Sequence, residues 1–384
     1  MGSRTGLTAV VLLVICSASC GFADDLFLLS YFKGNGETGV YLAASEDGLT
    51  FRDLNEERPI FAPPQWAGQN LTRDPSIVYR DSLFRMVWTS SWTGECFGAA
   101  TSPDLKQWSQ PVQTQPFKNW PANDRPINTW APEVHWDPVQ KNYAILWSSA
   151  TARVESDGGH NSGGLEKDPA RKVKPDPRHH RTFISRTTDF QNFTDAKVFF
   201  SPGVSEIDAM MAFDDRGTPD PADDRWVLVC KDEQVAELGG KNIRLTTAPA
   251  RVEGVPPSDR GRDARDTTTT PADLTNPFPP KFHSLTEPNK PWSGPVAGPG
   301  SSVQASQWAE GPTLLKVGSE WRLYFDRFRL RSNRFGLATS TDLLHWADRT
   351  SELTVPPQAM HGTIFRAPRA VISKALSAPR ANSR

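Results

Sequence analysis

The sequence lacks an excess of charge of either sign. Its 43 lysine and arginine residues nearly balance its 44 aspartate and glutamate residues. A chain without a basic surplus has no field suited to nucleic acid and no polybasic patch for an anionic membrane. We therefore expect no nucleic acid and no membrane surface among its partners, and we expect a monomer.

Long helical patterns and membrane-length apolar runs are also missing. No segment sustains an apolar repeat near 3.6 residues, and 33 prolines disfavour long helices. The apolar run Leu7–Ile15 is too short to cross a bilayer, and it lies between Arg4 and a stretch of small residues. This is typical of a signal peptide, so we predict that residues 1–23 are removed and that the protein is secreted or periplasmic. Lipid attachment at Cys20 is an alternative that fits poorly, because Ser17 stands three residues before it.

Cysteine is scarce. Without the predicted signal peptide only Cys96 and Cys230 remain, which excludes a disulfide framework. The two residues either pair with each other in an oxidising compartment or stay as buried thiols. The sequence leaves both alternatives open.

What the chain contains instead is a repeated hairpin pattern. Glu310 stands in a Gly/Pro corner just before the apolar run Thr313–Val317. A tight turn at Gly318 and Ser319 follows, and then a second run, Trp321–Phe325. Two such runs separated by a short polar turn predict a β-hairpin, with Glu310 at the start of its first strand.

The same arrangement recurs four more times. Each copy places a titratable residue before a predicted strand: Asp74 in RDPSIVY, Glu133 in APEVHWD, Asp208 in IDAMMAFDD and His361 in HGTIFRAP.

A second repeat follows the third strand of each unit. It combines a small hydroxyl residue, an aspartate, an apolar residue and an aromatic residue. An aspartate in such a turn bonds its own backbone amides, so we interpret the repeat as structural rather than catalytic or metal-binding. The copies are SEDGLTF at Ser45, SPDLKQW at Ser102, TTDFQNF at Thr187, STDLLHW at Ser340 and a weaker TAPARVEGV at Thr247.

Five repeats of about four short strands predict an all-β, five-bladed β-propeller over residues 24–376, with a C-terminal tail at 377–384. The N-terminal strands and the HGTIFRAP strand together complete one blade, which closes the ring and removes exposed sheet edges. Strand parity then places all five titratable residues around one mouth of the central axis. Two long insertions, about 151–180 and 252–307, are predicted on this mouth, the second without regular structure.

Carboxylates crowded around an axis repel one another, so at least one should have a raised pKa. A protonated acid facing an ionised one is the equipment for cleaving a glycosidic bond. The same ring suits a hard cation held by carboxylates and water. Residue chemistry alone therefore leaves open a glycosidase, a metal-binding propeller and a structural propeller.

The motifs TRDPSIVY, TWAPEVHWD, SEIDAMMAFDD, EGPTLLKVGSEWRLYFD and MHGTIFRAP resemble the blade openings of glycoside hydrolase family 43. The resemblance implies an inverting, five-bladed arabinofuranosidase-like or xylosidase-like enzyme. By position it makes Asp74 the general base, Glu310 the general acid and Asp208 the residue that orients the acid and raises its pKa. It makes His361 the axial histidine that contacts a central calcium ion or water cluster; no cofactor is required beyond that possible structural calcium.

Other residues are weaker candidates for sugar contacts. Trp92, Lys231 and Arg327 are predicted where second strands return to the mouth, and Trp130 and Trp308 stand shortly before two of the acids. Packing between blades is the alternative for each tryptophan. Glu133 is either a supporting residue of the substrate site or a structural residue of its corner.

We therefore predict a secreted hydrolase that removes α-L-arabinofuranosyl or β-xylosyl units, or galactofuranosyl units, from a polysaccharide. One alternative is a propeller that binds glycan or metal without turnover. Another is a related five-bladed glycosidase that acts on algal galactan.

Overall fold

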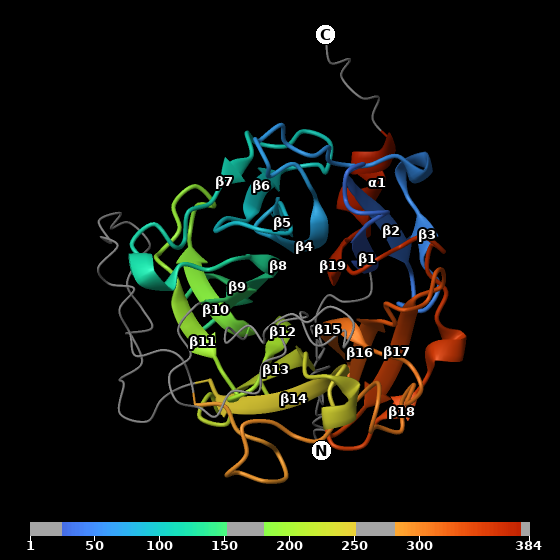
Figure 1. Cartoon of the computed structure of the whole chain (residues 1–384). Helices are drawn as coiled ribbons and strands as arrows, with labels where there is room; N and C mark the ends of the chain where they lie inside the picture. The colour runs from blue at the N-terminus through green and yellow to red at the C-terminus, as the bar shows by residue number, and fades with distance from the viewer. Residues whose placement is uncertain (1–24, 152–179, 251–280, 378–384) are drawn as a thin grey trace, which may run out of the picture.

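The structure, a computed structural model, describes residues 25–151, 180–250 and 281–377. Five small antiparallel sheets stand around a central axis (Figure 1). The predicted five-bladed β-propeller is confirmed. The predicted signal peptide and residues 152–179 and 251–280 of the two insertions lie outside the described residues.

The sheets follow one another along the chain, and each runs from the axis outward. Blade 1 has the order β19-β1-β2-β3, blade 2 β4-β5-β6-β7, blade 3 β8-β9-β10-β11, blade 4 β12-β13-β14 and blade 5 β15-β16-β17-β18. Their bounds are β1 Asp25–Phe32, β2 Val40–Ser45, β3 Arg52–Asp53, β4 Arg73–Arg80, β5 Leu83–Thr89, β6 Gly98–Ser102, β7 Val112–Gln113, β8 Trp130–Asp137, β9 Asn142–Ala150, β10 His180–Thr187, β11 Lys197–Phe200, β12 Glu206–Asp214, β13 Arg225–Asp232, β14 Asn242–Pro249, β15 Glu310–Val317, β16 Glu320–Asp326, β17 Phe335–Ser340, β18 Ala347–Asp348 and β19 Ile364–Pro368. Short 3-10 helices span Asn55–Glu57, Ala122–Asp124, Ala236–Leu238 and Thr350–Glu352.

Blade 1 joins the two ends of the chain, as the sequence predicts. Strand β19 pairs antiparallel with β1, with Asp25 opposite Pro368 and Leu29 opposite Ile364. The Ser30 amide also donates to the Thr363 carbonyl over 3.0 Å. This pairing closes the ring and covers the inner edge of β1.

The core consists of five apolar clusters, one between each pair of neighbouring blades. Alternation along the strands explains this, because successive side chains point to opposite faces of a blade. In β1, Leu26 and Leu28 pack towards blade 2, whereas Phe27 and Leu29 pack towards blade 5. The blades are therefore held by face-to-face packing of apolar side chains.

The aspartate turns are structural, as predicted. Asp47 accepts bonds from the amides of Leu49 and Thr50, at 2.8 and 3.0 Å. Three further aspartates do the same for amides two and three residues later: Asp104, Asp189 and Asp342. Each turn lies at the outer end of a third strand, away from the mouth.

The second insertion differs from its prediction. Blade 4 has three strands, and residues 281–297 run along the outer edge of β14 in place of a fourth. Isolated bridges join His283 to Thr247 and Ala297 to Ile243. Residues 281–297 therefore run from the end of β14 that lies away from the mouth back to the mouth. The prediction that all of 252–307 lies on the mouth is wrong for this segment.

The sequence also does not predict the helix α1, Arg369–Ser377, which follows β19 directly. Its Ile372 is buried in the cluster between blades 1 and 2.

Cys96 and Cys230 are free thiols, so of the two alternatives that the sequence leaves open, the structure has the unpaired one. Across the three described ranges, no helix has the length and apolar character needed to cross a membrane.

The blade 1 seam gives a stability prediction. A Cβ at Gly362 would come within 1.8 Å of the Ser30 carbonyl oxygen on β1. We expect Gly362→Ala to lower the free energy of unfolding by about 1–3 kcal/mol, because the seam must shift to admit the methyl group. Thermal or urea unfolding measures this. Gly294→Ala is the matched control, since no atom lies within 4 Å of its Cβ position; equal losses in both variants would contradict the prediction.

Candidate active site

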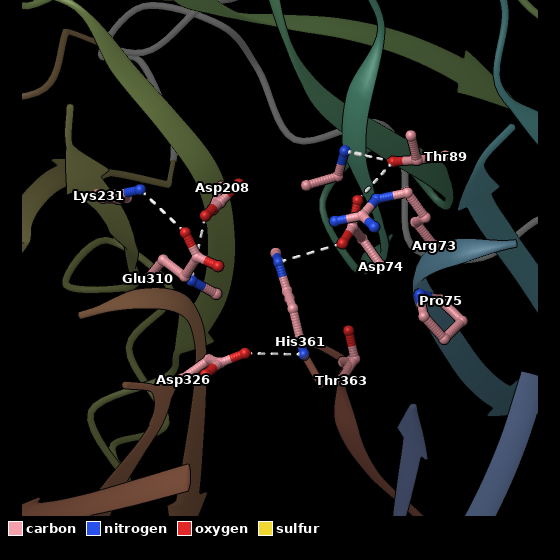
Figure 2. Close-up of polar contacts among 12 residues, drawn as sticks. Arg73, Asp74, Pro75, Thr89, Asp208, Lys231, Glu310, Asp326, His361 and Thr363 are labelled. Atoms are coloured by element: carbon pink, nitrogen blue, oxygen red, sulfur yellow. Dashed lines mark hydrogen bonds and ion pairs between the residues drawn. The ribbon is translucent and has the colours of Figure 1, made fainter. Parts of the chain in front are cut away.

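The innermost strand begins with a β-bulge in four of the blades. At each bulge the register with the second strand slips, and one residue adopts a left-handed backbone. These residues are Asp74 at φ 49°, Ala131 at 47°, Asp208 at 58° and Gly311 at 54°. At two of these positions the residue is an acid, and Figure 2 shows the side chains of Asp74 and Asp208 within the site.

The sequence interpretation treated the five titratable residues as equivalent, but their positions relative to the bulges differ. Asp74 and Asp208 occupy the bulge position, whereas Glu310 precedes its bulge residue by one. Glu133 lies two residues beyond its bulge residue, which places it deeper along the axis. The prediction that all five ring one mouth is wrong for Glu133.

Asp74 is buried and held from two sides. The Thr89 hydroxyl donates to its Oδ2 over 2.8 Å, and Thr89 Oγ1 in turn accepts the Ala131 amide of the next blade at 2.7 Å. His361 Nδ1 lies 3.4 Å from Asp74 Oδ1. The carboxylate therefore has a fixed orientation and an imidazole neighbour.

Glu310 lies across the site from Asp74 (Figure 2), and its side chain is about one-fifth exposed. Lys231 Nζ is 2.9 Å from its Oε2, and Arg334 Nη2 is 3.9 Å from its Oε1. Lys231 is buried and also pairs with Glu233 at 2.8 Å. Although burial opposes a charged ammonium, these carboxylates hold the pKa of Lys231 above its usual range.

Asp208 is buried next to Glu310 and is linked to it through the backbone of the following residue. Its Oδ2 accepts the amide of Gly311, the residue after Glu310, at 3.1 Å. A Cβ at Gly311 would come within 2.6 Å of the His361 ring, so this close approach requires glycine. Burial raises the pKa of Asp208 to about 6, with Glu310 and Asp74 adding to the rise and His361 opposing it. A raised pKa within the ring of acids is what the sequence predicts.

His361 lies between the two sides of the site. Burial lowers its pKa, but the surrounding acids Asp208, Asp74, Glu310 and Glu133 outweigh this and raise it. Its amide also donates to Asp326 Oδ2 at 3.0 Å. The imidazolium form therefore balances part of the negative charge at the axis.

These residues do not form a side-chain cage for calcium. In the described part of the chain, no three or more His, Cys, Asp or Glu side chains are grouped so that they could hold a metal ion. Calcium prefers six to eight oxygen ligands, whereas the His361 nitrogen faces Asp74. The predicted calcium at His361 remains a prediction.

Glu133 lines a cavity of about 370 Å³ formed by inner-strand residues from all five blades. Its Oε1 accepts the Thr363 hydroxyl at 2.7 Å, and Oε2 is buried without a hydrogen-bond partner in the described structure. Burial raises its pKa to about 7. A role below the site fits this position better than direct sugar contact.

The tryptophans form two walls of the mouth. On the Asp74 side, Trp92 is half exposed and makes an edge contact with Trp130, whose ring stacks on His180 at 4.9 Å. On the Glu310 side, Trp308 contacts Phe328 with ring centroids 5.8 Å apart. All three predicted tryptophans thus lie at the mouth.

Arg327 does not face the site. Its guanidinium donates to the carbonyls of Asn333, Arg334 and Phe335 and to Gln304, which makes it a brace for the loop after β16. The arginine beside Glu310 is instead Arg334, which also pairs with Asp326 at 2.8 Å.

The sequence interpretation missed Thr89, Asp326 and Arg334. A signal for the first two exists, because a polar residue stands at or near the end of the second strand of blades 2, 3, 4 and 5: Thr89 in RMVWT, Ser148 in AILWS, Asp232 in VLVCKD and Asp326 in RLYFD. Thr89 and Ser148 each accept the amide of the bulge residue in the next blade, and Asp326 accepts the amide of His361 in blade 1. No comparable pattern marks Arg334.

Glu206, behind Asp208 on β12, gives a pH prediction. Its Oε1 accepts the Thr182 hydroxyl at 2.7 Å, and burial raises its pKa from 4.5 to about 8. The folded protein thus favours the protonated acid, and this contribution to stability is complete below pH 4.5 and lost as pH rises towards 8. Because Gln imitates the protonated form, we expect the stability of Glu206→Gln relative to wild type to increase over this range. Denaturant unfolding at several pH values tests this, and a constant difference would contradict it.

A comparison with protein-family models places residues 24–248 in a family described as a "probable glycosyl hydrolase domain" and related to glycoside hydrolase family 43. The match spans more than half of the chain. The chain belongs to this family. The family 43-related assignment and the glycosidase class predicted from the sequence are confirmed at the family level. The matched region holds Asp74 and Asp208 and ends before Glu310.

Several solved structures are similar to this family 43-related hydrolase at low sequence identity. A thermostable family-43 glycoside hydrolase is 16% identical, with a TM-score of 0.40 over 72% of this chain and 70% of the other. An exo-β-1,3-galactanase from Phanerochaete chrysosporium is 14% identical, with a TM-score of 0.43 over 83% and 53%. One from Clostridium thermocellum is 11% identical, with a TM-score of 0.40 over 72% and 47%. The chain thus covers about half the length of these galactanases. Among curated proteins, no match was found.

Proposed function

We propose that this family 43-related hydrolase is a secreted, inverting glycosidase that removes α-L-arabinofuranosyl, β-xylosyl or galactofuranosyl units from a polysaccharide. One observation carries the proposal. Asp74 and Glu310 come from blades 2 and 5, which are far apart in the sequence, yet they lie on opposite sides of one axial site (Figure 2). Inverting hydrolysis needs two carboxyl groups that flank the scissile bond with room for water.

In the proposed mechanism Asp74 is the general base. Its carboxylate, fixed by the Thr89 hydroxyl, takes a proton from a water molecule as that water attacks the anomeric carbon. Glu310 is the general acid, and it gives its proton to the glycosidic oxygen as the bond breaks. Its greater exposure suits this role, because the leaving group departs towards solvent.

Asp208 and His361 act through these two residues. Asp208 accepts a hydrogen bond from the Gly311 amide and thereby fixes the backbone beside Glu310. His361 pairs with Asp74 and compensates for the crowding of negative charge. Asp208 and His361 are therefore positioning residues in this proposal.

Export is part of the proposal. The predicted signal peptide ends at Ala23, and the family match begins at residue 24. A polysaccharide too large to enter a cell also requires an external enzyme. Release of the protein into the medium by its natural leader would support this.

The direct test is hydrolysis of aryl α-L-arabinofuranosides, β-xylosides and galactofuranosides by the purified wild-type protein. NMR of the first product should show inversion of the anomeric configuration. The panel also includes agar oligosaccharides and β-1,3-galactan, the polymer named for two of the structures above. Cleavage confined to agar oligosaccharides would favour the algal galactan alternative. Binding without any cleavage would favour the non-catalytic propeller.

A further inference from the structure

Arg73, the residue before Asp74, has an uncompensated charge. Its Nη1 donates to Asn35 Oδ1 at 3.1 Å, and no carboxylate of the described residues lies within 4.0 Å of its guanidinium. The charge of Arg73 helps to lower the pKa of the exposed Glu37, but it is the weakest of several causes. An arginine has five N–H donors, so most of those on Arg73 lack a partner in the described part of the protein.

Other half-buried arginines of the propeller differ from Arg73 in this respect. Arg85 and Arg327 each donate to two or more backbone carbonyls. Four others pair with buried aspartates: Arg186 with Asp137, Arg225 with Asp214, Arg244 with Asp232 and Arg334 with Asp326.

The Arg73 side chain is nevertheless held firmly in place. Its guanidinium carbon lies 4.6 Å from the ring centre of Phe32 and 4.1 Å from that of Trp92. Asn35 also accepts the Trp92 indole N–H, at 2.9 Å. Two aromatic faces therefore fix the plane of the guanidinium while leaving its N–H edges for another acceptor.

We propose that Arg73 binds an anionic substituent, a uronate carboxylate or a sulfate ester, on the glycan beside Asp74. This inference rests on the proposed function for the location of the glycan. In Figure 2, Arg73 lies on the Asp74 side of the site, opposite Lys231 and Glu310. A carboxylate and a sulfate both match the planar fork of arginine through two parallel hydrogen bonds. The preferred substrate is therefore an acidic polysaccharide.

The test measures binding, so that it does not depend on turnover. Two matched pairs of probes are titrated by calorimetry at low salt, in the Glu310→Gln background. One pair is xylo-oligosaccharides with and without glucuronic acid, and the other is galacto-oligosaccharides with and without sulfate esters. We expect the anionic member of at least one pair to bind roughly tenfold tighter or more. The pair that shows this preference identifies the anion.

Arg73→Gln should reduce the preference to about one, and Arg73→Lys should retain only part of it. Arg80→Gln is the matched control, because Arg80 ends the same strand and lies equally close, 4.1 Å, to Trp136 at the far end. It should keep the full preference. Melting temperatures of all variants show whether Arg73 merely stabilises the fold.

Equal binding of both members in both pairs overturns the inference, as does a preference that survives Arg73→Gln. Failure to bind either anionic probe also overturns it. A different result would overturn the proposed function: the wild type would cleave no glycan, although binding that depends on Arg73 would persist.

Discussion

Glu310→Gln should lower kcat on an oligosaccharide substrate by roughly 10²- to 10⁴-fold, the usual contribution of a general acid. The amide keeps the size of the side chain and can still accept a hydrogen bond from Lys231, now 2.9 Å from Oε2. What it loses is the proton for the glycosidic oxygen. A dinitrophenyl glycoside needs little protonation of its leaving group, so its hydrolysis should fall far less. Steady-state kinetics on the two substrates measures the difference.

Asp74→Asn is the matched comparison. Its loss should be equally large on both substrates, because attack by water needs the base whatever the leaving group. The Thr89 hydroxyl can still donate to the amide oxygen, so the local fold should persist. If Glu310→Gln loses equal activity on good and poor leaving groups, Glu310 is not the acid.

Lys231→Met should lower the free energy of unfolding by about 3–5 kcal/mol, the usual effect of removing one partner from a buried ion pair. Only 4% of the lysine side chain is exposed, and it lies between Glu233 and Glu310. Removing it leaves Glu233 with Lys241 as its cation and Glu310 with only the more distant Arg334. Activity should also fall, because Glu310 is no longer held in place. Urea unfolding and steady-state kinetics measure the two effects.

Lys316→Met provides the contrast. Lys316 pairs with Asp214 at 2.7 Å, but its side chain is 30% exposed and lies at the other end of β15. Solvent screens such a pair, so its loss should cost about 1 kcal/mol or less and leave activity unchanged. Similar destabilisation by both substitutions would show that the burial of Lys231 does not determine how much its ion pairs contribute to the free energy of unfolding.

The fold could be predicted because its signals are local and repeated. Hairpins such as Glu310–Asp326 recur along the chain and the aspartate turns recur in four of the five units, so several weak signals support one another. The missing fourth strand of blade 4 could not be predicted, since residues 281–297 carry no strand pattern and depend on bridges to β14. The helix α1 is too short to show a recognisable apolar periodicity in the sequence, and its stability depends on the burial of Ile372.

The site was partly predictable for a similar reason. Asp74 and Glu310 stand at strand starts that the pattern identifies. The bulges are less visible, because a shift of one residue changes which side chain faces the axis. Glu133 lies away from the mouth because it stands two residues beyond its bulge residue. The path of the loop after β16 brings Arg334 rather than Arg327 beside Glu310. Those outcomes depend on three-dimensional contacts.

The seam between β1 and β19 also sets when this enzyme can first act. His361 lies three residues before β19, the last strand of the described propeller to be made, whereas its partner Asp74 is made early in synthesis. A nascent chain on the ribosome therefore holds β1 without its inner partner, and an incomplete centre, until residues 361–368 emerge. A premature stop codon anywhere before residue 361 removes the closing strand and the imidazole together, so the product exposes the inner edge of β1 and lacks the partner of Asp74.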